Sequence, residues 1–167
     1  MITLVLGGVR SGKSELAERL AARRGPVTYV ATGPSGQGME ERIAAHRARR
    51  PADWGTVEVT TDGLARSIAS VDDGTLLVDS LGTWVAGHHE LRIDAAALLD
   101  ALSACGADVV LVSDEVGLSV HPETELGRHF QDVLGALNRS VSAMADRTLV
   151  VVAGRVIELG AAIEEFE

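Results

Sequence analysis

The stretch that most constrains this chain is GGVRSGKSEL at residues 7–16, which follows the short apolar run Ile2–Leu6. Residues 7–14 fit the phosphate-binding loop pattern Gly-x-x-x-x-Gly-Lys-Ser without a mismatch. In such a loop the glycines let backbone N–H groups approach phosphates, and the start of the next helix adds positive potential. Lys13 supplies a mobile charge at the β and γ phosphates, and the Ser14 hydroxyl suits Mg²⁺. The loop therefore predicts a site for a nucleoside triphosphate.

Alternating strand and helix patterns predict the fold class. The runs Leu76–Asp79 and Val109–Val112 are continuously apolar and each leads to an acid, as in buried strands of a parallel sheet. Leu126–Ala145 carries the longest helical pattern, with an apolar stripe on one face. This alternation predicts an α/β fold with a mainly parallel sheet. The other predicted elements are helices from the loop through about Arg23, at Met39–Arg50 and at Leu64–Ser70, and strands at Val27–Ala31, Thr56–Thr60, Thr148–Ala153 and Arg155–Leu159.

Length, charge and cysteine content narrow the class of protein. A chain of 167 residues predicts one domain spanning 1–167. The formal net charge of −9 disfavours general binding to nucleic acid. The single cysteine, Cys105, excludes an internal disulfide and is compatible with a reducing cytoplasm. Because the sequence has no apolar run of membrane-spanning length and no signal-peptide pattern, we expect a cytoplasmic protein without a membrane span.

Two acidic segments are candidates for completing a Mg²⁺ site, which usually needs an acid at the end of a strand near the loop. The segment TLLVDS reaches Asp79, and VVLVSDEVG reaches Asp114 and Glu115. An acid at either junction could instead cap the helix that follows. The spacing alone leaves the two segments equally suitable.

The basic stretch RIAAHRARRP at residues 42–51 is a second candidate for chemistry. On a helix, one face would carry Arg42, His46, Arg49 and Arg50. A solvated basic face is the ordinary interpretation of such a run. The chain as a whole is acidic, however, and arginine suits bidentate binding of phosphate. Like charges would disfavour protonation of the imidazole, so a neutral His46 is a candidate nucleophile for a nucleotidyl group.

Segments spread nearly from end to end carry a family resemblance. They are LGGVRSGKS at 6–14, YVATG at 29–33, MEERIAAHRARRPADWGTVE at 39–58, LLVDSLGTW at 76–84, VLVSDEVG at 110–117 and ADRTLVVVAG at 145–154. These segments resemble the bifunctional adenosylcobinamide kinase / adenosylcobinamide-phosphate guanylyltransferase family of cobalamin biosynthesis. Arg10-Ser11 within the loop and the segment around His46 at 39–58 are more specific for this family than the phosphate-binding loop pattern alone. The chain departs from the family pattern at Gly38, where an acid is usual, and at Asp114, where asparagine is usual.

The resemblance implies a fold and a pair of reactions. The fold would be a three-layer, RecA-like phosphate-loop nucleoside triphosphatase domain, assembled as a homotrimer. The enzyme would first phosphorylate the aminopropanol hydroxyl of adenosylcobinamide with ATP or GTP. It would then transfer GMP from GTP to adenosylcobinamide phosphate through a GMP-histidine intermediate, giving adenosylcobinamide-GDP and pyrophosphate.

The resemblance also implies site residues, matched by position. The catalytic residues would be His46 and Lys13. Mg²⁺ would be held by Ser14 and Asp79, directly or through water, which favours Asp79 over the later acids. Glu115 is a candidate for contact with the substrate or the metal. The nucleotide contacts would fall on Gly7, Gly8, Val9, Arg10, Ser11, Gly12, Lys13, Ser14, Ala31, Thr32, Gly33, Arg47, Ala48, Arg49, Arg50, Glu58 and Asp79.

Two other functions fit the loop alone. A small-molecule kinase without nucleotidyl transfer would need the phosphate loop but not His46. A nucleotide-binding regulator without turnover would need only the loop, with the His46 face merely solvated.

Overall fold

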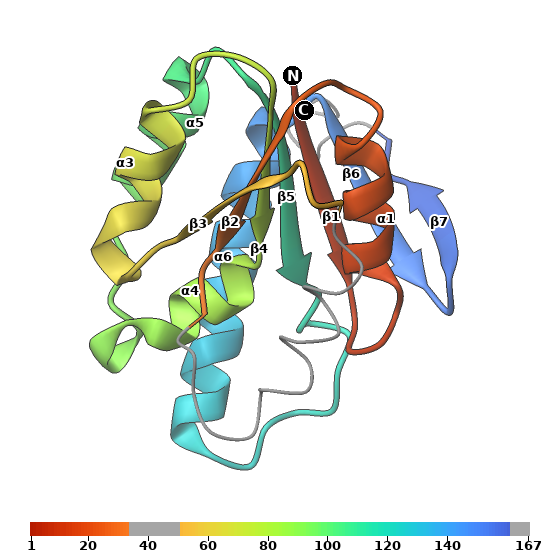
Figure 1. The fold of residues 1–167 in the computed structure, drawn as a ribbon. Coiled ribbons are helices and arrows are strands. Elements are labelled where there is room, and N and C mark those ends of the chain that lie inside the picture. Colours follow the sequence, from red (N-terminus) through yellow and green to blue (C-terminus); the bar gives the residue numbers. More distant parts are fainter. Residues whose placement is uncertain (34–50, 161–167) are drawn as a thin grey trace.

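A computed structural model describes residues 1–33 and 51–160 of the chain and contains a seven-stranded sheet (Figure 1). The strand order is β3-β2-β4-β5-β1-β6-β7. In this order across the sheet, the strands from β3 through β6 run parallel to one another, and β7 pairs with β6 antiparallel. The predicted α/β fold with a mainly parallel sheet is confirmed. The strands are β1 (Ile2–Gly7), β2 (Val27–Ala31), β3 (Gly55–Glu58), β4 (Thr75–Asp79), β5 (Asp108–Asp114), β6 (Arg147–Val152) and β7 (Arg155–Glu158).

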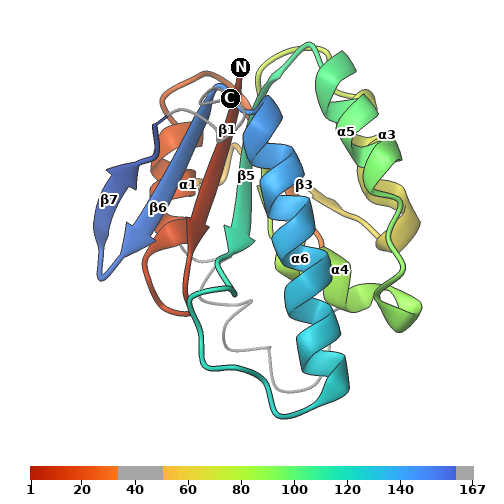
Figure 2. The ribbon, with the colours of Figure 1, turned by 180° about the vertical axis from the view of Figure 1, so that it is seen from behind.

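Helices cover both faces of the sheet, so the molecule has three layers (Figures 1 and 2). Side chains alternate along a strand, so Leu4 and Leu6 enter one half of the core while Val5 enters the other. The half that contains Val5 is closed by α1, and the half that contains Leu4 is closed by α3, α4, α5 and α6. The helices are α1 (Lys13–Ala21), α3 (Leu64–Ala69), α4 (Leu81–Gly87), α5 (Ala95–Ala104) and α6 (Glu125–Met144), with short 3₁₀ turns at Thr61–Gly63 and His89–Leu91.

The longest helix, α6, follows the predicted apolar stripe. Leu134, Leu137 and Val141 are buried against the sheet, while Phe130 and Val133 are partly buried beside them. Thr124 caps the start of the helix, and its side chain accepts a hydrogen bond from the backbone N–H of Gly127 at 3.1 Å. Within the described ranges, no helix is both long and apolar enough to cross a membrane.

Two differences from the predicted elements have simple causes. All four residues of the edge strand β3 are exposed, so no buried face marks its ends. The weak alternation in the sequence therefore predicted Thr56–Thr60, whereas the strand spans Gly55–Glu58. Helices α4 and α5 were both missing from the predicted elements. The 7 residues of α4 are too few to show a helical period. Helix α4 begins with a capping box in which Ser80 accepts from the backbone N–H of Thr83. The predicted helix at 39–50 lies outside the described residues.

Parallel pairing places several strand ends at one edge of the sheet. In the register of β1 with β5, Gly7 lies opposite Asp114, and in that of β4 with β5, Asp79 lies opposite Val112. The start of the phosphate-binding loop and both candidate acids therefore share the carboxyl edge of the sheet. Ligands bind at this edge in open α/β sheets.

An ion pair adds to the antiparallel pairing of the outer strand β7 with β6. Arg147 donates from Nε and Nη2 to the two carboxylate oxygens of Glu158 at 2.7 and 2.9 Å. This hydrogen bonding lowers the pKa of Glu158 and raises the pKa of Arg147. Both side chains are exposed at the surface, so salt and water weaken the pair.

Acidification is expected to loosen β7. Because the folded-state pKa of Glu158 is lowered, the stabilisation by the pair is present above the ordinary glutamate pKa and is lost as pH falls through the lowered value. Hydrogen exchange at the amides of Arg155–Glu158, corrected for intrinsic rates, should therefore rise below about pH 4. Glu158→Gln should remove this acid step, and Glu15→Gln, which breaks an exposed pair on α1, should leave it in place. An acid step that persists in Glu158→Gln would contradict the assignment.

Candidate functional site

The loop between β1 and α1 has the backbone shape that its glycines predict. Gly12 has φ +97°, a left-handed conformation that side chains rarely adopt. A Cβ at Gly7 would lie 2.8 Å from the carbonyl oxygen of Val151, so the close approach of β6 requires glycine there. The carbonyl of Ser11 accepts from the N–H of Gly154 at 2.9 Å. The loop is therefore held against the β6–β7 turn.

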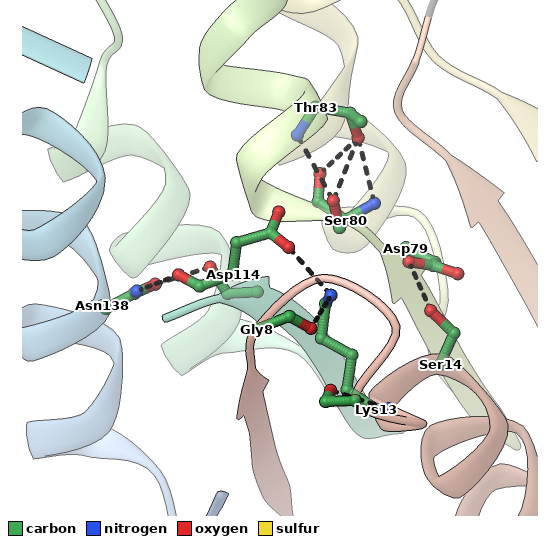
Figure 3. Close-up of polar contacts among 10 residues, drawn as sticks. Gly8, Lys13, Ser14, Asp79, Ser80, Thr83, Asp114 and Asn138 are labelled. Carbon is green, nitrogen blue, oxygen red and sulfur yellow. Dashed lines mark hydrogen bonds and ion pairs between the residues drawn. The ribbon is translucent and has the colours of Figure 1, made fainter. Parts of the chain in front are cut away.

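Lys13 is buried at the start of α1, with 9% of the residue exposed. Its Nζ donates to the carbonyl oxygen of Gly8 at 3.2 Å and forms an ion pair with Oδ1 of Asp114 at 2.8 Å (Figure 3). A buried ammonium needs such partners because it has lost its hydration. The lysine of the loop thus lies between the loop backbone and the end of β5.

Ser14 and Asp79 face one another across the edge of the sheet. The Ser14 hydroxyl donates to Oδ1 of Asp79 at 3.4 Å, and the buried phenol of Tyr29 donates to Oδ2 at 3.0 Å (Figure 3 draws the first contact). Tyr29 therefore fixes which carboxylate oxygen faces Ser14. A hydroxyl and a carboxylate oxygen are donors that Mg²⁺ prefers, so this pair fits the predicted metal. Nowhere in residues 1–33 and 51–160 do three or more His, Cys, Asp or Glu side chains gather as metal ligands.

A hydroxyl network joins the ends of β2 and β4. The Thr32 hydroxyl donates to the carbonyl of Ser80 at 2.6 Å and accepts from the Ser80 N–H at 2.9 Å. It also lies 2.7 Å from the Thr83 hydroxyl, which belongs to the capping box of α4. Thr32 and Ser80 are buried, so this network fixes the predicted nucleotide segment at 31–33 beside Asp79.

Buried Asn138 of α6 supports the end of β5. Its Oδ1 accepts from the Ser113 hydroxyl at 2.6 Å, and its Nδ2 donates to the carbonyl of Asp114 at 3.0 Å (Figure 3). Sequence reasoning did not single out Asn138, Tyr29 or Thr83. The signal for Asn138 is a polar residue directly after Leu137 on the otherwise apolar stripe of α6.

The other predicted residues are placed as follows. Glu58 ends β3 opposite Ala31, so it reaches the same edge of the sheet. Glu115 is half-buried; its backbone N–H donates to the carbonyl of Gly7 at 3.1 Å, and its side chain accepts from the N–H of Gly117 at 2.8 Å. Val9 and Arg10 are exposed at the loop tip. His46, Arg47, Ala48, Arg49 and Arg50 lie outside the described residues.

The strand–loop–helix geometry, with a buried lysine and a facing serine–aspartate pair, defines a phosphate-loop nucleotide-binding protein. A solved ATPase from the type III secretion system of pathogenic bacteria shares this fold, with a TM-score of 0.54 and 14% identity. The match covers 89% of this chain, which spans half the length of that ATPase. The RecA-like phosphate-loop fold is thereby confirmed.

Sequence comparison identifies the family. The sequence model of the cobinamide kinase / cobinamide phosphate guanyltransferase family matches residues 3–159, and the chain belongs to this family of enzymes. It is 43% identical to the bifunctional adenosylcobalamin biosynthesis protein CobP of Pseudomonas aeruginosa, over 92% of this chain and 94% of that protein. It is 37% identical to the bifunctional adenosylcobalamin biosynthesis protein CobU of Salmonella typhimurium, over 92% of this chain and 97% of that protein. The family resemblance seen in the sequence is confirmed.

Removing the amide of Asn138 is expected to destabilise the fold. Asn138→Ala leaves the buried Ser113 hydroxyl and the Asp114 carbonyl without this partner, which should lower the free energy of unfolding by about 1–3 kcal/mol. Urea unfolding followed by circular dichroism measures the change. Ser140→Ala on the same helix removes an exposed hydroxyl and should change stability by less than about 0.5 kcal/mol. Equal effects of the two substitutions would show that the Asn138 contacts contribute nothing.

Proposed function

We propose that this chain catalyses two successive transfers in cobalamin biosynthesis. In the first, adenosylcobinamide is phosphorylated with ATP or GTP. In the second, GMP moves from GTP to adenosylcobinamide phosphate through a covalent GMP-histidine on His46. The products of the second step are adenosylcobinamide-GDP and pyrophosphate.

The observation that carries this proposal is a complete phosphate-loop site inside a nearly full-length family match. At the carboxyl edge of the sheet Lys13 pairs with Asp114 and Ser14 faces Asp79, although these residues come from three separate segments of the chain. The relatives that cover almost the whole chain are named as bifunctional cobalamin biosynthesis proteins. Together these features support a site that handles a triphosphate for both reactions.

The kinase step requires positioning and charge neutralisation more than covalent chemistry by the protein. The acceptor hydroxyl oxygen bonds to the γ-phosphorus, and the bond from that phosphorus to the β–γ bridging oxygen breaks. The nucleoside diphosphate leaves, and the hydroxyl proton passes to solvent. Lys13 and the N–H groups of Gly7–Ser14 would hold the β and γ phosphates and stabilise charge on the leaving oxygen.

The guanylyl step divides one displacement into two. A ring nitrogen of His46 bonds to the α-phosphorus of GTP, and pyrophosphate leaves. A phosphate oxygen of adenosylcobinamide phosphate then bonds to the same phosphorus, and the phosphorus–nitrogen bond breaks. The histidine is regenerated, so no other reactant is consumed.

Mg²⁺ is the cofactor that we assign to Ser14 and Asp79. When bound there, it would neutralise charge on the triphosphate oxygens. Tyr29 would keep Oδ1 of Asp79 turned toward Ser14, since its phenol donates to the other oxygen. The protein's contribution is thus the orientation of two oxygen donors.

Substitution of the proposed nucleophile should separate the two reactions. Incubation with α-labelled GTP should leave an acid-labile, base-stable label on the wild-type protein, as expected for a phosphorus–nitrogen bond. His46→Ala should lose this label and guanylyl transfer but keep kinase activity, because the phosphate loop is unchanged. His129→Ala, which changes an exposed histidine of α6, should keep the label, guanylyl transfer and kinase activity.

Each other outcome of that experiment rejects part of the proposal. Guanylyl transfer that survives His46→Ala would rule out the covalent route. Kinase activity without any label or pyrophosphate in the wild type would indicate a monofunctional small-molecule kinase. GTP binding without turnover in the presence of adenosylcobinamide and its phosphate would indicate a regulator.

The metal assignment predicts a graded response to substitution. Asp79→Asn should weaken Mn²⁺ binding in the presence of saturating GTP, measured by electron paramagnetic resonance. Tyr29→Phe, which removes the orienting hydrogen bond to Asp79, should weaken Mn²⁺ binding about tenfold. Asp100→Asn, an exposed acid on α5, should leave Mn²⁺ binding unchanged. Unaltered binding in Asp79→Asn would move the metal site to another acid.

A further inference from the structure

Asp114 holds the loop lysine in a way that neither reaction explains. Its Oδ1 lies 2.8 Å from Lys13 Nζ, so the carboxylate occupies one of the three donor directions of the ammonium. The carbonyl oxygen of Gly8 accepts a hydrogen bond along a second donor direction of the ammonium. A triphosphate that approaches Lys13 therefore meets an anion already paired with it.

The position of Asp114 is fixed by three separate elements. Register places it opposite Gly7, and the next residue, Glu115, donates its N–H to the Gly7 carbonyl. Asn138 of α6 donates to the carbonyl of Asp114. A Cβ on Gly82 of α4 would collide with Oδ2 of Asp114, so the glycine leaves the space that the carboxylate fills. These contacts keep the carboxylate beside the lysine.

The charge of Asp114 opposes that of a nucleotide at this place. A carboxylate repels the β and γ phosphates that Lys13 would bind, and it attracts the lysine away from them. The side chain of Asp114 is 29% exposed and that of Lys13 11%, so water screens the attraction only in part. The monophosphate of GMP lacks β and γ phosphates and should feel this opposition less.

We propose that Asp114 is a built-in competitor for Lys13. It pairs with the lysine before nucleotide binds, yields it to the β and γ phosphates, and takes it back when diphosphate or pyrophosphate leaves. Asp114 thereby lowers affinity for triphosphate and speeds its release, which suits a site that must exchange nucleotides between two reactions. The inference rests on the proposed binding of GTP by the Gly7–Ser14 loop.

The test is nucleotide binding by wild type and Asp114→Asn. Calorimetric titration with GTP and with GMP, in Mg²⁺ buffer, gives the two dissociation constants, and stopped-flow displacement of a fluorescent N-methylanthraniloyl GTP gives the release rate. Asp114→Asn should bind GTP about threefold to tenfold more tightly, the size expected for a partly exposed ion pair, with slower release. GMP affinity should change less.

Asp108→Asn is a matched control on the same strand. Asp108 begins β5 as Asp114 ends it, is 32% exposed, and pairs with the N-terminal ammonium at 3.0 Å. The Asp108→Asn substitution makes the same change in net charge at the opposite end of the strand, so GTP affinity should stay unchanged. Asp114→Ser repeats the neutralisation with a smaller side chain and covers the case in which asparagine disturbs folding.

The remaining outcomes overturn the inference. GTP affinity that is unchanged or weaker in both folded Asp114 variants would show that the carboxylate does not compete for Lys13. An equal gain for GMP would show a general charge effect rather than competition at the β and γ phosphates. Loss of kinase turnover with unchanged GTP affinity would make Asp114 a proton acceptor instead. Wild-type protein that fails to bind GTP would refute the proposed function itself, which is a separate result.

Discussion

The site depends on the parallel pairing of β5 with β1 on one side and with β4 on the other. This pairing places Gly7 opposite Asp114 and brings Asp79 to the same edge of the sheet. A shift of the register by one residue would turn every side chain of β5 to the other face, which would place Val109 and Leu111 in the wrong half of the core. The packing that stabilises the sheet thus also fixes the distances among the charged groups.

Burial of Lys13 gives the carboxylate of Asp114 a structural role at the edge of the sheet. An ammonium with 9% of its residue exposed has lost most of its water, and the Gly8 carbonyl replaces only part of that hydration. Asp114 supplies the remaining partner at the cost of opposing an anionic ligand. Stability of the folded loop and affinity for triphosphate therefore make opposite demands on the same side chain.

The sequence predicted what depends on local pattern and did not predict what depends on three-dimensional neighbours. The loop motif, the strand Val27–Ala31 and the stripe of α6 were all read from spacing, because glycine placement and apolar periodicity are local. Tyr29 and Asn138 were missed because each acts through a residue far away in the chain, at Asp79 and Ser113. The residues of the loop motif were thus easier to find than the residues that orient their surroundings.

The choice between the two acids shows the same limit. Both follow a buried strand, so residue type and position could not distinguish Asp79 from Asp114 without the family resemblance. In the structure the two differ in their partners, since Asp79 faces the hydroxyls of Ser14 and Tyr29 while Asp114 faces an ammonium. The hydroxyl donors at Asp79 could give way to the metal ion that we propose there, and the ammonium at Asp114 is already a cationic partner. Strand order decides which partner each acid receives, and these partners are the basis of the role that we propose for each.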